Sequence, residues 1–123
     1  MKLSEIQRRL ESDVVVGWTD DIEVPTACGS DLISDILRFT EAGSALLTGL
    51  TSLQMIRTAD LLDISVIVFV RGKRPNKHIL HHAAEMQIPI LCTPFTLYEA
   101  CGMLFEGGLK ACQRTVSLKE HNA

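Results

Sequence analysis

Three short, almost continuous apolar runs, each followed by a helical pattern, constrain the fold of this chain more than any other feature. The runs are ALLT (45–48), VIVFV (66–70) and IPILC (88–92). Strands of a parallel sheet that is covered on both faces have such uninterrupted apolar sequences, because neither face meets water. With right-handed crossovers, this alternation of strand and helix predicts a three-layer α/β/α fold around a mainly parallel sheet.

Helical patterns follow these runs, and each carries an apolar stripe that predicts one face packed on the sheet. Thr51 is expected to cap the first of these helices and Thr96 the last, because threonine hydroxyls accept hydrogen bonds from the free N–H groups of a first turn. Pro75 is expected in the first turn of the middle helix, where proline is tolerated. Gly107 and Gly108 are expected to end the last helix.

The segment before residue 28 predicts shorter elements. Ser4 followed by Gln7 suggests a capping box for a helix that reaches about Glu11. VVVGW (14–18) is a candidate strand. IEVP (22–25) is a second candidate strand, which its proline cuts short.

The segment CGSDLISDILRFT (28–40) reads as a turn followed by a helix whose N-cap is Ser30. Four of its apolar residues are expected to be buried: Leu32, Ile33, Ile36 and Leu37. Together with Phe39 they exceed what one stripe against one sheet face needs, and a small chain gains stability by burying apolar area between subunits. The pattern predicts a homodimer with residues 28–40 at or near the contact. The alternative is that the C-terminal tail covers Leu32 and Phe39 within one chain.

Length and charge exclude several classes of protein. At 123 residues the chain has the length of a single domain, taken as 1–123. Its net charge of −3 argues against nucleic-acid binding, which usually requires a basic excess. No apolar run approaches the ~20 residues that span a bilayer, and the N-terminal MKLSEIQRRLESD has no signal-peptide core. We therefore expect a cytoplasmic protein that binds neither nucleic acid nor membranes.

The four cysteines are expected to be free thiols, which suit that compartment. Cys28, Cys92, Cys101 and Cys112 form no CxxC pair and match no common zinc spacing. Burial as small apolar side chains is the expected role. A reactive thiolate at Cys28, near the start of a helix, is the alternative.

Two further groups of side chains have spacings that metal ligands can use. Asp31 and Asp35 lie one helical turn apart, and His78 and His82 are spaced i, i+4 with His81 between them. Asp31 also suits a helix N-terminus, where it complements the dipole, and the histidines lie largely outside the apolar stripe of their helix. We therefore expect solvated side chains here, with no metal, no cofactor and no catalytic residue.

Three strand-to-helix turns are expected to meet at one edge of the sheet: TGLTS (48–52), RGKRPNK (71–77) and TPFT (93–96). Open α/β sheets bind ligands outside the carboxyl ends of their strands, and each turn leads into a helix N-terminus that favours an anion. The cations of the middle turn make a phosphate or carboxylate ligand plausible. The alternative is that they only solvate a surface turn. Neither GxxxxGK[ST] nor GxGxxG occurs.

Three segments resemble a known family: SDLISDILRF (30–39), LLTGLTSLQMIRTADLLDISVIVFVRGKRP (46–75) and IPILCTPFTLYEACGMLFEGGL (88–109). Over about residues 28–109 the chain resembles the small stand-alone DRTGG-domain proteins, although the letters DRTGG are absent. IPILCTPFT is also similar to the end of the N-terminal domain of HPr kinase/phosphorylase. The resemblance implies a Rossmann-like α/β/α module, commonly dimeric, that senses a ligand or regulates. It does not extend to a P-loop kinase domain, so it implies no enzyme activity.

The resemblance also marks positions for ligand binding: Ser30, Asp31, Asp35, Thr48, Gly49, Thr51, Arg71, Gly72, Lys73, Thr93 and Thr96. The tail 110–123 is polar and lies outside it. We interpret the chain as a regulatory domain that binds a small anionic, nucleotide-like ligand at the carboxyl edge of its sheet. Single-domain relatives are often encoded beside iron-only hydrogenase components. The alternative is therefore an interaction-only subunit that docks on a redox or hydrogenase complex and binds no metabolite.

Overall fold

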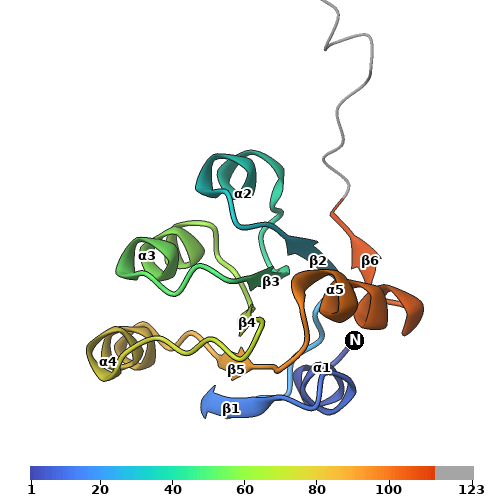
Figure 1. The fold of residues 1–123 in the computed structure, drawn as a ribbon, viewed down its shortest axis with the longest axis horizontal. Coiled ribbons are helices and arrows are strands. Elements are labelled where there is room, and N and C mark those ends of the chain that lie inside the picture. The colour runs from blue at the N-terminus through green and yellow to red at the C-terminus, as the bar shows by residue number, and fades with distance from the viewer. Residues whose placement is uncertain (113–123) are drawn as a thin grey trace, which may run out of the picture.

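Six strands form one sheet in residues 1–112, the part of the chain that this computed structural model describes (Figure 1). In chain order the strands are β1 (Asp13–Val16), β2 (Thr26–Gly29), β3 (Ala45–Thr48), β4 (Val66–Phe69), β5 (Ile90–Cys92) and β6 (Lys110–Ala111). Their spatial order is β1-β5-β4-β3-β2-β6. Every neighbouring pair is parallel except β1 with β5. The predicted three-layer, mainly parallel α/β/α fold is confirmed.

Five helices in the described part of the chain cover the two faces of this sheet. They are α1 (Leu3–Arg9), α2 (Ile33–Phe39), α3 (Leu53–Leu61), α4 (Lys77–Glu85) and α5 (Leu97–Glu106). Figure 1 shows α2, α3 and α4 side by side on one face, and α1 and α5 on the other. No helix within residues 1–112 is long and apolar enough to cross a membrane.

The two cores lie on opposite faces of β3 and β4, the central strands. Leu46 and Ile67 point toward the α2–α3–α4 layer, whereas Leu47 and Val68 point toward α1 and α5. Every residue of both strands is buried, because helices cover both sides. This explains why these strands read as unbroken apolar runs.

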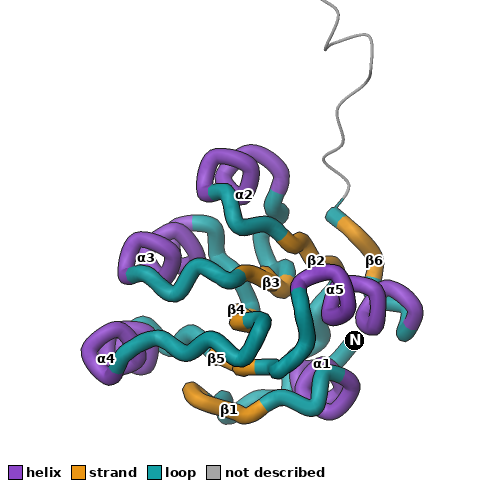
Figure 2. Tube along the Cα trace, viewed as in Figure 1, coloured by secondary structure: helices purple, strands orange, loops and turns teal. Residues whose placement is uncertain are grey.

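The chain changes face after β5, and this places a topological switch between β4 and β5. The connections that follow β2, β3 and β4 run through α2, α3 and α4 on one face. The connection after β5 turns to α5 on the other face and ends in β6, beside β2 (Figure 2). Ligands of open α/β sheets bind outside the carboxyl ends of the strands at such a point.

Two short strands were not predicted. β2 has the sequence TACG, which lacks the apolar β-branched run of the other parallel strands, and it was expected to end in a turn. β6 lies in what was expected to be an unpatterned tail, yet Lys110 pairs with Thr26 of β2. Both are defined by their neighbours in the sheet rather than by local sequence. The remainder of that tail, 113–123, lies outside the described residues.

Several predicted features near the N-terminus are wrong. Helix α1 begins after Lys2, which makes no side-chain cap, and the Ser4 hydroxyl instead donates to Asp21 (2.5 Å). The expected strand at 22–25 is reduced to a single bridge between Lys2 and Glu23. The strand expected at 14–18 is confirmed as β1, although it ends at Val16.

The predicted caps of the later helices are correct at α5 and displaced elsewhere. Thr96 forms the full capping box with Glu99. The cap of α3 is Ser52, one residue after the expected Thr51. Pro75 is buried just before Asn76, the cap of α4, because the asparagine side chain supplies the oxygen that this helix start needs.

Helix α2 departs from the predicted burial. Its N-cap position is Leu32, whose N–H donates to the hydroxyl of Ser30 (3.0 Å). Only Ile36 is fully buried, while Leu32 is 56% exposed and Leu37 is 43% exposed. Seven residues give too few turns for all these side chains to reach the sheet, so α2 presents an apolar surface to solvent within the described chain.

Candidate functional site

The turn after β4 has an unusual backbone conformation at the switch point. Arg71 and Gly72 have φ angles of 59° and 67°, and the N–H of Lys73 donates to the carbonyl of Val70 (3.2 Å). Positive φ at both central residues is typical of a type I′ turn, in which glycine, asparagine or aspartate is the usual choice. Arginine rarely adopts positive φ, so Arg71 has a sparsely populated backbone conformation.

Arg71 differs from the other non-glycine residues that have positive φ in the described chain. Three more non-glycine residues have positive φ: Glu11, Asp63 and Gln87. Each directly follows the C-cap of a helix, where a left-handed residue is routine. Arg71 ends no helix. Backbone outliers of this kind cluster at functional sites, so the conformation directs attention to the side chain it positions.

Two backbone hydrogen bonds hold this turn against the turn after β5. The N–H of Arg71 donates to the carbonyl of Phe95 (2.7 Å), and the N–H of Gly72 donates to the carbonyl of Thr93 (2.9 Å). These bonds join the two turns that flank the topological switch. The backbone that carries Arg71 is therefore fixed to the turn after β5.

The guanidinium of Arg71 lies against the turn after β3. A Cβ atom built on Gly49 would be 2.2 Å from the Arg71 Nη2 atom, so a side chain at position 49 would displace the guanidinium from this place. The same Nη2 lies 3.5 Å from the Asp31 Oδ2 atom. The other oxygen, Asp31 Oδ1, accepts from the N–H of Gly49 (2.6 Å) and from the hydroxyl of Thr48 (3.2 Å).

The contacts of Asp31 thus join three turns of the carboxyl edge. The sequence suggested that this carboxylate complements the N-terminus of its own helix. In the structure it accepts hydrogen bonds from the β3–α3 turn instead. The register of β2 explains this, because the N–H of Ser30 donates to the carbonyl of Leu47 (3.1 Å) and so extends the β2–β3 ladder toward Gly49.

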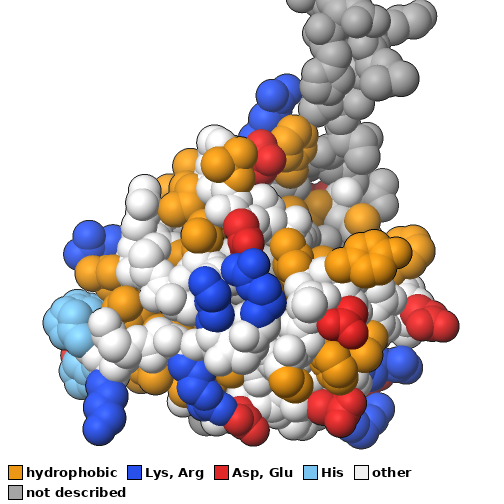
Figure 3. Space-filling view, in the orientation of Figure 1, with side chains coloured by type: hydrophobic (Ala, Val, Ile, Leu, Met, Phe, Trp, Pro, Cys, Tyr) orange, Lys and Arg blue, Asp and Glu red, His pale blue; other side chains and the backbone are white. Residues whose placement is uncertain are grey.

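Positive charge gathers over this edge of the sheet. Arg71 and Lys73 are exposed, and Figure 3 shows Lys and Arg side chains near the middle of the face, over the ends of β3 and β4, beside acidic ones. Arg74 lies in the same turn but pairs with Asp13 of β1. Arg71 and Lys73 therefore remain for a ligand, and Arg71 already faces Asp31.

Two of the threonines predicted to bind the ligand make hydrogen bonds that stabilise the fold. Thr93 is fully buried, and its hydroxyl donates to the carbonyl of Leu10 (2.6 Å), linking β5 to the end of α1. The Thr96 hydroxyl accepts from the N–H of Glu99, and its own backbone N–H holds the pKa of the Glu99 carboxyl below the usual value. Both hydroxyls are occupied by these structural bonds.

The other residues predicted to bind the ligand either lie apart from the Asp31–Gly49–Arg71 contact or belong to it. Asp35 is exposed and Ser30 is half-buried at the start of α2, and the Asp35 carboxylate makes no hydrogen bond or ion pair within residues 1–112. Thr51 is half-buried and precedes the cap of α3. The structure brings together Asp31, Thr48, Gly49 and Arg71, with Gly72 and Lys73 in the same turn.

The cysteines and histidines do not join this group. Burial raises the pKa of the Cys28, Cys92 and Cys101 thiols, which disfavours the reactive thiolate considered for Cys28. His78 and His82 contact each other edge to face, with ring centroids 4.8 Å apart. Among the described residues, no group of three or more His, Cys, Asp and Glu side chains is placed to hold a metal ion.

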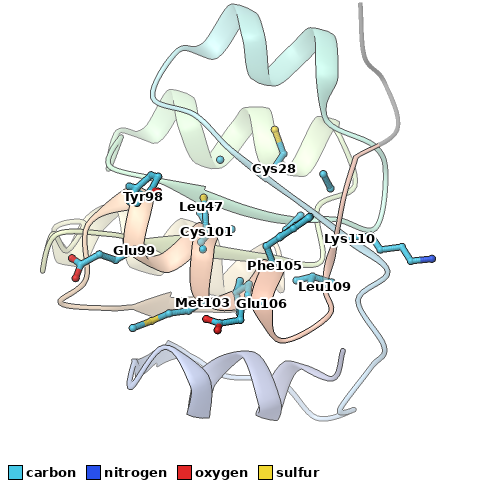
Figure 4. Close-up of a pocket in the computed structure, with 15 residues that line it drawn as sticks. Cys28, Leu47, Tyr98, Glu99, Cys101, Met103, Phe105, Glu106, Leu109 and Lys110 are labelled. Carbon is cyan, nitrogen blue, oxygen red and sulfur yellow. The ribbon is translucent and has the colours of Figure 1, made fainter.

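Sequence reasoning missed an apolar groove of about 590 Å³ on the α1–α5 face (Figure 4). It lies between α5 and the strands β2 and β6, where two helices leave part of a six-stranded sheet uncovered. Tyr98 (90% exposed) and Phe105 (69% exposed) stand near the two ends of α5, with Cys101 between them. The groove could not be predicted because β2 and β6 were not.

Comparison with known proteins gives a structural likeness only. No family model and no curated protein sequence matches the chain. The fold is similar to the crystal structure of the CBS and DRTGG domains of the regulatory region of Clostridium perfringens pyrophosphatase, complexed with its activator diadenosine tetraphosphate. The TM-score is 0.72 and the identity 16%, over 98% of this chain and 56% of that one. At this identity the likeness shows the fold, and the chain spans just over half of that structure.

Proposed function

We propose that the chain is a non-enzymatic regulatory domain that binds a small anionic, nucleotide-like ligand over the β3–α3 and β4–α4 turns. The observation that carries the proposal is the conformation of Arg71, an arginine held at positive φ with its guanidinium packed on Gly49. The fold likeness supports it, because the similar structure is a regulatory region in complex with a dinucleotide activator.

The turns offer two kinds of group to a phosphate. Arg71 and Lys73 supply exposed cationic donors, and charge-assisted hydrogen bonds to an anion are stronger than neutral ones. The first turn of α3, after Ser52, supplies backbone N–H groups and the positive end of the helix dipole. Thr48, Gly49, Gly72 and Asp31 shape the space between them.

The proposal includes the domain type implied by the sequence. We infer a DRTGG-like domain, related to the N-terminal domain of HPr kinase/phosphorylase, that works in the cytoplasm. Its four cysteines are free, which suits a reducing compartment. Its signal would pass through a homodimer or a partner such as a hydrogenase component.

Thermal unfolding against a panel of nucleotides and phosphorylated metabolites tests the proposal. A ligand at a hundred times its dissociation constant stabilises the folded state by about 2.7 kcal/mol. We expect an increase in melting temperature with at least one polyphosphate compound, such as diadenosine tetraphosphate, and none with the matching nucleoside. No shift with any compound would contradict the proposal.

A second candidate is an interaction-only subunit that docks on a redox complex. The specific observation in its favour is the groove beside α5, because Tyr98 and Phe105 are large apolar side chains that remain exposed on its rim. Contiguous exposed apolar surface often marks a protein contact. The panel distinguishes the two candidates, since this one predicts no metabolite-dependent shift.

A further inference from the structure

The carboxylate of Asp31 occupies the position in which the β3–α3 turn would receive an anion. It accepts the Gly49 N–H at 2.6 Å and the Thr48 hydroxyl at 3.2 Å, and it faces the guanidinium of Arg71 at 3.5 Å. A backbone N–H, a hydroxyl and a guanidinium are also the donors that bind phosphate oxygens. One side chain of the protein therefore uses three donors that an anionic ligand would need.

We propose that Asp31 is an internal competitor of the ligand, and that its displacement by a phosphate is the switch of this domain. The inference rests on the proposed function, and it adds how binding is transmitted. A phosphate that takes the donors of Gly49 and Arg71 repels the carboxylate, because like charges only a few ångströms apart are unfavourable at a protein surface. Asp31 then leaves the turn.

The displacement moves α2, because Asp31 directly precedes Leu32, the N-cap residue of this helix. The bond between the Leu32 N–H and the Ser30 hydroxyl is a local restraint on the cap, and it lies within the segment that would move. The helix is short, and Ile36 is its only fully buried residue. Its exposed residues Leu32 and Leu37 would shift with it. Release of Asp31 thereby changes the apolar surface that α2 presents.

The test compares Asp31→Asn with Asp35→Asn, using inorganic pyrophosphate as the probe in calorimetric titrations. Both variants remove one negative charge from the same segment, but Asp35 is exposed and touches neither Gly49 nor Arg71 in the described structure. We expect Asp31→Asn to bind pyrophosphate at least about tenfold more tightly than the wild type, from loss of a neighbouring like charge. Asp35→Asn is expected to stay within about twofold.

A second measurement uses the wild type alone, so it does not depend on the variant's stability. In ¹⁵N-labelled protein, pyrophosphate is expected to shift the amide signals of residues 31–39 together with that of Gly49. Equal pyrophosphate affinities for Asp31→Asn and Asp35→Asn, or an unchanged 31–39 segment on binding, would overturn the switch while leaving the anion site in place. If neither the wild type nor Asp31→Asn binds pyrophosphate, the anion site fails and the switch with it.

Discussion

Replacing both Arg71 and Lys73 with alanine is expected to weaken pyrophosphate binding by about a hundredfold without unfolding the protein. Each cation contributes a charge-assisted hydrogen bond, which at an exposed site is worth about 1.5 kcal/mol, or roughly tenfold in affinity. The backbone of the turn depends on bonds from main-chain atoms to Phe95 and Thr93, which alanine retains. The exposed Arg71–Asp31 pair adds little stability. Calorimetric titration and thermal unfolding measure the two effects.

The matched control for this variant is Arg57→Ala with Lys110→Ala. Both residues are exposed, on α3 and β6, and their loss changes the net charge by the same amount. We expect nearly unchanged binding, because ion screening limits charges that are distant from the site. A marked fall in the melting temperature of the Arg71/Lys73 variant alone would show that these cations support the fold, and the anion site would lose its main support.

Sedimentation at micromolar concentration is expected to show a homodimer of the 13.6 kDa chain that Leu37→Glu dissociates. Leu32 and Leu37 leave apolar area on α2 uncovered by residues 1–112, and a two-fold contact would bury that area against its own copy. The carboxylate introduced by Leu37→Glu would be buried and unpaired in the contact, and this costs enough free energy to oppose dimer formation. The sheet itself should persist, because Leu37 is not part of either core.

Leu61→Glu is the control for the dimer, since Leu61 is 77% exposed at the end of α3. It introduces the same side chain near the end of a helix that borders α2, and it should leave the dimer intact. A wild type that sediments as a 13.6 kDa monomer would contradict the dimer outright. Dissociation by Leu61→Glu, with no effect of Leu37→Glu, would move the contact to α3.

The central part of the fold was predictable because burial on both faces of a strand produces a recognisable apolar run in the local sequence. β3, β4 and β5 carry only residues that suit a dry environment on either side, so their runs are apolar without interruption. The start of α5 was predictable for a similar reason. Thr96 and Glu99 form a capping box whose geometry depends on three consecutive peptide units rather than on distant residues.

β2 was not predictable because its composition is determined by its packing partner. A Cβ at Gly29 would lie 2.5 Å from the Cys101 sulfur and 3.3 Å from Leu97, so α5 requires a glycine in this strand. Glycine reads as a turn in a sequence. The two residues of β6 are equally dependent on β2, and α2 was expected to be more buried than it is.

The candidate site was only partly predictable. The cations of the β4–α4 turn and Gly49 could be assigned to one edge from the ends of the strands. The approach of Asp31 to Gly49 could not, because it depends on the register of the unpredicted strand β2 with β3. The structural roles of Thr93 and Thr96 were also hidden, since a polar residue after a strand looks the same whether it faces a ligand or the backbone.

The position of a bound dinucleotide on the protein tests the central claim most directly. In ¹⁵N-labelled protein titrated with diadenosine tetraphosphate, the largest amide shifts are expected at residues 48–53 and 71–73, the turns that carry Gly49 and Arg71. The Arg71/Lys73 double variant should lose these shifts at the same concentration. Shifts confined to the groove residues of α5 and β6, or no shift in the wild type, would contradict an anion site at the carboxyl edge of the sheet.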